Sequence, residues 1–148
     1  MIDEIVYDKE GLNALVYIAD GDMRNAVNNL QAIHISTGMI TRENVYQICD
    51  VPSKEKIEKM FNRLLVGDLD GGIMEFNLLW KEDYCLHDLV VYLARTCERM
   101  DEVQLDLRME MMVLASHLKM NETEGIMSKT QILGFLAKIC QLGIIYSK

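Results

Sequence analysis

The sequence has one proline, few aromatic side chains and little positive charge. Of its 148 residues 7% are aromatic, and 15 Lys and Arg stand against 23 Asp and Glu, which gives a net charge of −8. Because an acidic chain binds phosphate backbones poorly, this composition opposes a direct nucleic-acid binder. No apolar run reaches the roughly 18 residues that a membrane span needs. The acidic start, MIDEIVYD, is unlike a signal peptide.

The sequence also lacks the motifs of a self-contained active site. It contains no Gly-x-Ser-x-Gly, no Walker lysine loop and no Gly-x-Gly-x-x-Gly. Its four cysteines, Cys49, Cys85, Cys97 and Cys140, form no Cys-x-x-Cys pair, and its three histidines lack the i,i+4 partners of a helical metal site. We therefore expect buried free thiols, no metal site and no catalytic residue.

Hydrophobic residues recur with helical spacing along almost the whole chain. The spacing, together with capping residues and glycines, predicts helices over residues 8–21, 22–38, 41–49, 53–67, 70–80, 86–100, 102–118 and 128–140. The sequence shows no convincing strand. These features predict an all-α protein.

Pro52 is the predicted boundary between two helical modules, because proline breaks a helix. Residues 1–51 are expected to form a three-helix module that is too small to be very stable alone. Residues 52–148 are expected to form a helical bundle. Two of its runs, LHDLVVYLA and ILGFLAKIC, are apolar on more than one face. Either they form a crowded core, or part of their surface packs on other subunits.

Arg24 is the residue that the helical pattern does not explain. Asp22 is a natural cap for a helix that starts at Met23, so Arg24 falls in the first turn. A cation there is mildly unfavourable, because a helix start carries partial positive charge and unpaired N–H groups. Arg24 is either an ordinary surface residue, exposed or salt-bridged to Asp20 or Asp22, or it is an anion ligand. In the second case it would receive, beside the unpaired N–H groups, a phosphate held by another domain.

The segment around Arg24 resembles a known protein family. Residues 7–31, YDKEGLNALVYIADGDMRNAVNNLQ, resemble the lid segment of clamp-loader small subunits, the replication factor C family of AAA+ ATPases. In that family the Gly-Asp-Met-Arg run carries the sensor 2 arginine. The likeness continues through ITRENVYQICDVPSKEKIEKM, similar to the exit from lid to collar. Residues 61–97 resemble the first collar helices, and MSKTQILGFLAKIC resembles the last.

The resemblance implies a role for each module. Residues 1–51 would be the AAA+ lid (sensor 2) domain, and residues 52–148 the C-terminal collar or oligomerisation domain, which joins the subunits into a ring. Arg24 would be the nucleotide-binding residue and would reach the γ-phosphate of ATP, which the ATPase domain holds together with Mg. The intact subunit would be an AAA+ ATPase of the nucleus. With the other clamp-loader subunits as partners, it would load the sliding clamp on primer–template DNA.

Two departures limit the resemblance. The Walker A and Walker B motifs and the arginine finger of the family's Ser-Arg-Cys motif are absent, so the chain would be the C-terminal part of a longer subunit and no enzyme by itself. The stretch ASHLKMNETEGIMSKT is longer and more acidic than its counterpart in the family, so the contacts assigned to that counterpart are not carried over. The alternative hypothesis is a free-standing all-α adaptor without a nucleotide role, in which Arg24 is ordinary surface charge.

Overall fold

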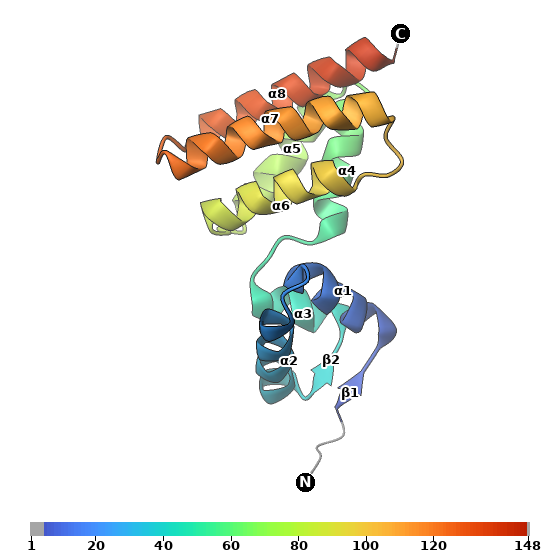
Figure 1. Cartoon of the computed structure of the whole chain (residues 1–148), viewed down its shortest axis with the longest axis vertical. Helices are drawn as coiled ribbons and strands as arrows, with labels where there is room; N and C mark the ends of the chain where they lie inside the picture. The colour runs from blue at the N-terminus through green and yellow to red at the C-terminus, as the bar shows by residue number, and fades with distance from the viewer. Residues whose placement is uncertain (1–4, 148) are drawn as a thin grey trace. The chain divides into compact units, whose positions relative to one another are not determined.

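The computed structural model describes residues 5–147, which are helical almost throughout (Figure 1). In chain order the elements are β1 (Val6–Tyr7), α1 (Lys9–Ala19), α2 (Met23–Thr37), β2 (Met39–Ile40), α3 (Arg42–Cys49), α4 (Lys54–Leu65), α5 (Leu69–Trp80), α6 (Leu86–Arg99), α7 (Leu105–Thr123) and α8 (Lys129–Tyr146). The predicted all-α fold class is confirmed. The chain divides into two compact units, Met1–Val51 (unit 1) and Pro52–Lys148 (unit 2).

Unit 1 is built from α1, α2 and α3, which pack against one another. Its buried apolar side chains come mostly from α1, and α2 and α3 contribute one each, Ile33 and Val45. Asp8 and Thr41 cap α1 and α3, since their side chains accept hydrogen bonds from the N–H groups of Gly11 and Asn44. Local caps and a small core together define this unit.

The sequence prediction of no strands is wrong for two short segments of unit 1. β1 and β2 form a parallel pair of two residues each. A pair this short shows no alternation of apolar and polar residues, so periodicity could not reveal it. The N–H of Asp8 donates to the Ile40 carbonyl at 3.0 Å, which continues the pairing into the start of α1. Here α1 comes so close to β2 that a Cβ on Gly11 would lie 2.3 Å from the Ile40 oxygen, so only glycine fits.

Unit 2 is a bundle of five helices. α7 packs on α6 and α8, and α5 packs on α4 and α8, with α4 and α8 also in contact. Phe61 of α4 and Phe135 of α8 meet edge to face, with ring centroids 6.2 Å apart. Other fully buried side chains of this core are Ile57, Met60, Leu64, Phe76, Leu79, Leu89, Leu93, Met111 and Ile132.

Several helices of unit 2 begin or end away from their predicted limits. The largest extension is in α8, which was predicted to end at residue 140 and continues to Tyr146. α5 begins at Leu69, and its cap is Asp68, which accepts the Gly71 N–H at 2.9 Å. This hydrogen bond, with a second from Arg63, lowers the pKa of Asp68. α7 begins at Leu105 rather than residue 102 and continues to Thr123. Residues 119–123, which the predicted ranges leave between two helices, are therefore helical.

The two apolar runs of unit 2 lie mainly in its own core. In LHDLVVYLA, buried residues are Leu89, Val90, Tyr92 and Leu93, and in ILGFLAKIC they are Ile132, Phe135, Leu136, Ile139 and Cys140. The crowded-core interpretation therefore describes these runs. Exposed apolar side chains of unit 2 include Met74 and Leu78 of α5 and Ile144 and Ile145 of α8. The largest group forms the outer face of α7, which consists of Leu105, Met109, Met112, Val113 and Met120.

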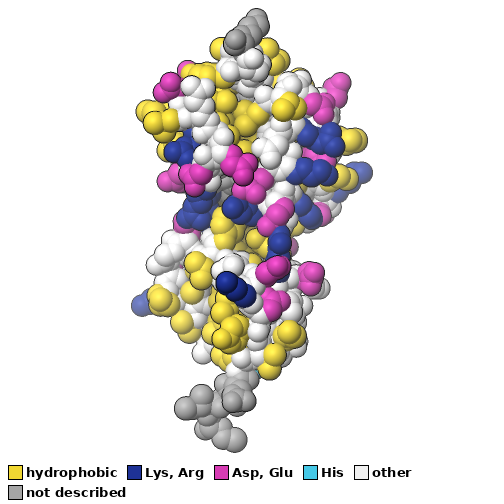
Figure 2. Space-filling view, turned by 90° about the vertical axis from the view of Figure 1, so that its right-hand side faces the viewer, with side chains coloured by type: hydrophobic (Ala, Val, Ile, Leu, Met, Phe, Trp, Pro, Cys, Tyr) yellow, Lys and Arg dark blue, Asp and Glu magenta, His cyan; other side chains and the backbone are white. Residues whose placement is uncertain are grey.

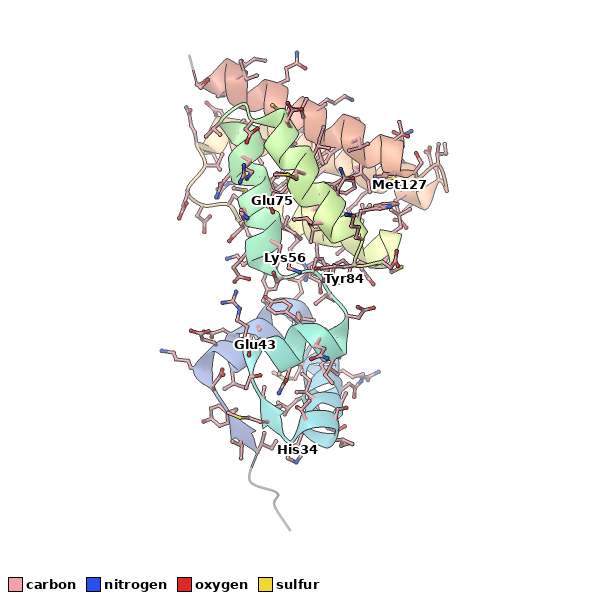
Figure 3. All side chains as sticks on the ribbon, turned by 180° about the vertical axis from the view of Figure 1, so that it is seen from behind. His34, Glu43, Lys56, Glu75, Tyr84 and Met127 are labelled. Carbon is pink, nitrogen blue, oxygen red and sulfur yellow. The ribbon has the colours of Figure 1, made fainter. Side chains whose placement is uncertain are left out.

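Ion pairs link α4 to α5 and to the segment that follows α5. Glu75, labelled in Figure 3, has a side chain only 12% exposed and receives Lys59 at 2.8 Å and Arg63 at 3.4 Å. Lys56 and Tyr84 both bond to Glu82, and these bonds lower the pKa of its carboxyl group against the opposing effect of burial. The carboxylates of Glu75 and Glu82 therefore hold α4 against α5 and the segment that follows it.

The thiols differ in burial, so the expectation of buried cysteines holds only in part. Cys97 and Cys140 are buried, Cys49 is half-buried, and Cys85 is exposed at the start of α6. Burial raises the pKa of the Cys97 thiol to about 12.

We expect a thiol reagent at pH 8 to modify Cys85 first and Cys97 only after unfolding. Cys85 is exposed to the reagent, whereas burial shields Cys97 and its raised pKa suppresses the reactive thiolate. The release of a chromophoric thiol measures the rate, and Cys85→Ser should remove the fast phase. Fast modification of Cys97 in the folded Cys85→Ser variant would contradict the structure.

Gly143 marks the closest approach of α8 to α4. A Cβ on Gly143 would lie 2.4 Å from the carbonyl oxygen of Leu65, whereas a Cβ on Gly134, also in α8, would meet nothing within 4 Å. We expect Gly143→Ala to lower the free energy of unfolding of unit 2 by about 1–3 kcal/mol through overpacking.

The matched control is Gly134→Ala, which should raise the stability by up to about 1 kcal/mol, because alanine favours a helix interior. Urea unfolding followed by the fluorescence of Trp80, the single tryptophan, reports on unit 2. Equal stability of the two alanine variants would show that the helices do not approach as closely as described.

Candidate functional site

A tight turn between α1 and α2 determines where Arg24 lies. Asp20 and Gly21 both have positive φ, 49° and 84°, and the N–H of Asp22 donates to the Ala19 carbonyl at 2.9 Å. Two consecutive left-handed residues redirect the chain, so that α2 starts immediately after α1. The turn places Arg24 in the first turn of α2, as the sequence indicated.

Asp22 caps α2 and uses the N–H groups beside Arg24. One oxygen of its carboxylate accepts the N–H of Arg24 at 2.9 Å and that of Asn25 at 3.1 Å. The expectation that N–H groups near Arg24 are unpaired is therefore wrong for these two, because the short aspartate side chain bonds them locally. An anion at this helix start would have to be held by the guanidinium of Arg24.

The side chain of Arg24 points to solvent and is left without a protein partner. Within residues 5–147 it makes no hydrogen bond, ion pair or ring contact, and so no salt bridge to Asp20 or Asp22. Arginines elsewhere in this range do have partners: Arg63 and Arg108 pair with carboxylates at 3.1 Å and 2.6 Å. A guanidinium carries five N–H donors in a fixed fork that suits phosphate or carboxylate. Arg24 is therefore free to receive an anion.

The rest of α2 is more open than its sequence indicates. Its sequence places Ala26, Val27, Leu30 and Ile33 on one helical face, and of these four only Ile33 is buried. One and two turns beyond Arg24, the side chains of Asn28 and Gln31 are exposed. The spacing of apolar residues locates this face but does not show how much of it is buried. A small module has few other helices with which to cover it.

Two hollows on the described surface of unit 2 are smaller than a usual ligand pocket. A hollow between α7 and α8 has a volume of about 90 Å³, and another, between α4 and the end of α6, about 250 Å³. Small-molecule pockets generally measure roughly 300–1,000 Å³. Among the described residues, no group of three or more His, Cys, Asp and Glu could hold a metal ion. None of the described helices has the length and apolar character of a membrane span.

Comparison with known proteins identifies the region to which these units correspond. The family model described as Replication factor C C-terminal domain matches residues 52–138. This range lies within unit 2 and includes α4, α5, α6 and α7, with the first half of α8.

Individual relatives match both units. Replication factor C subunit 4 of Saccharomyces cerevisiae is 32% identical over 95% of this chain and 43% of its own length. Replication factor C subunit 4 of Oryza sativa is 32% identical over 92% of this chain and 40% of its own length. The replication factor C small subunit of Haloarcula marismortui is 30% identical over 94% of this chain and 43% of its own length. The chain thus spans about two fifths of the length of these curated relatives. It belongs to the replication factor C small-subunit family, of which it represents the C-terminal region.

Proposed function

We propose that this chain is the lid and collar part of a clamp-loader subunit that acts in DNA replication. Unit 1 is the lid and senses ATP through Arg24. Unit 2 is the collar and joins the subunit to its neighbours. The family membership supports this assignment, and the observation that carries it is the partnerless guanidinium of Arg24 at the start of α2.

The geometry around Arg24 is suited to the γ-phosphate of ATP. The turn and the Asp22 cap hold the backbone of Arg24 in one place, while its side chain keeps all its donors available. Two N–H groups bond to one oxygen of the Asp22 carboxylate, and no ion pair joins this carboxylate to the guanidinium among the described residues. Charge-assisted hydrogen bonds between arginine and phosphate are among the stronger polar contacts in proteins. The nucleotide and its Mg²⁺ would be held mainly by an ATPase domain outside this sequence, and this chain alone would not hydrolyse ATP.

The surface of unit 2 supports assembly better than DNA binding. The outer face of α7 presents apolar side chains that its own bundle leaves uncovered, as subunit interfaces do. On the face shown in Figure 2, Lys and Arg lie among Asp and Glu instead of forming one basic field. The partners of unit 2 would be other clamp-loader subunits. The sliding clamp and primer–template DNA would be reached through the complete nuclear complex.

We expect Arg24→Ala in the intact subunit to weaken ATP-dependent clamp loading while leaving the melting temperature almost unchanged. The lost interaction, a hydrogen bond to a charged group, is worth about 1.5–3 kcal/mol. This corresponds to a roughly 10- to 100-fold higher ATP concentration for half-maximal loading. The measurement is loading of a labelled clamp on primed DNA against ATP concentration.

Arg42→Ala is the matched control, because Arg42 also stands at the start of a unit 1 helix but lies 4.0 Å from the Glu10 carboxylate. It should shift the ATP dependence less than about twofold, as a partly exposed surface pair contributes little. If Arg24→Ala loads the clamp like the unmodified subunit, the sensor role is refuted and the adaptor hypothesis gains support.

A further inference from the structure

The hollow between α7 and α8, here called the α7–α8 hollow, has a polar rim and an apolar floor. Leu118 and Phe135 are the buried apolar residues that line it. The rim residues are His117, Asn121, Gln131 and Lys138. Two come from each helix, and all four side chains can donate hydrogen bonds.

These rim side chains have no bonds within the described part of the chain. Neither a hydrogen bond nor an ion pair engages the side chain of any of the four. Lys138 is positively charged, and no Asp or Glu lines the hollow, although the sequence holds 23 acidic residues against 15 Lys and Arg. The hollow therefore concentrates donors and positive charge on an acidic protein, which favours a carboxylate.

Gly134 leaves the α8 backbone open at this hollow. The fold of unit 2 does not require glycine there, since an added Cβ would meet nothing within 4 Å. A glycine inside a helix makes the helix less stable than an alanine at the same position does. Because residue 134 has no long side chain, the hollow is not filled from the α8 side.

The volume of the hollow is suited to one side chain of a partner. Its volume of about 90 Å³ is several times the 10–15 Å³ that one water requires, but well below that of a small-molecule pocket. Val113 and Met120, on the outer face of α7, lie one turn on either side of His117 and are 56% and 55% exposed. Packing on these two side chains would exclude water from a charged pair in the hollow and so strengthen it.

We propose that the α7–α8 hollow receives the carboxylate of an Asp or Glu carried by a helix of a neighbouring clamp-loader subunit. The methylene groups of that residue contact the apolar floor, and its carboxylate pairs with Lys138 and the rim donors. The partner helix packs on Val113 and Met120, as a knob enters a hole between two helices. This inference rests on the proposed collar role of unit 2, to which it adds the docking place and the chemistry of the partner.

The test uses the complete multisubunit complex, with the intact subunit carrying Lys138→Glu or Gly134→Leu. The first variant reverses the charge at the rim, and the second fills the hollow. Each should weaken incorporation of the subunit at least about tenfold, measured by titration against the remaining subunits with native mass spectrometry. Both positions are exposed, so the variants should fold normally, which circular dichroism and thermal melting of the free subunit check.

Lys119→Glu and Gly134→Ala are the matched controls. Lys119 is an exposed lysine of α7 that does not line the hollow, and alanine leaves most of the hollow open. Both controls should assemble within about twofold of the unmodified subunit. Normal incorporation of Lys138→Glu and Gly134→Leu would overturn the inference.

A third variant separates this inference from the proposed function. Met109→Glu alters the outer face of α7 away from the hollow. If it blocks assembly while Lys138→Glu and Gly134→Leu do not, the collar role stands and the hollow inference fails. If the unmodified subunit itself does not assemble, the collar role fails as well. Salt-dependent DNA affinity that Lys138→Glu abolishes, with assembly intact, would identify a phosphate as the occupant and refute the carboxylate.

Discussion

The cap that Asp22 forms on α2 determines what Arg24 can do. By accepting the N–H groups of Arg24 and Asn25, the Asp22 carboxylate fixes the helix start and satisfies its donors. The guanidinium of Arg24 is not bonded to this acid and remains without a partner in the described chain. A cation held at a positively polarised helix end is mildly unfavourable by itself. An incoming phosphate would turn that unfavourable position into a binding site.

The two units use their helices differently. Unit 1 buries little of α2 and leaves Arg24 in solvent, as expected of a module whose surface completes a site formed with another domain. Unit 2 has a dense core in which a glycine of α8, Gly143, lets the helix lie against the α4 backbone. Its uncovered features, the outer face of α7 and the α7–α8 hollow, are adjacent. A rigid bundle that presents such a surface is suited to assembly.

The helices were predictable because their caps and glycines act locally. Asp8, Asp22 and Thr41 cap helices where the sequence placed them. Periodicity locates an apolar face but not what covers it. It therefore could not tell that the runs LHDLVVYLA and ILGFLAKIC are covered mainly by their own bundle, while the outer face of α7 is left exposed. The position of Arg24 was likewise predictable, whereas the bonding of its neighbouring N–H groups depends on the Asp22 rotamer, which no sequence pattern reveals.

The most direct test of the account is a structure of the complete subunit with a slowly hydrolysed ATP analogue and Mg²⁺, resolved well enough to position side chains. The account predicts the guanidinium of Arg24 within about 2.7–3.2 Å of a γ-phosphate oxygen. A closed nucleotide site in which this side chain remains in solvent would contradict it.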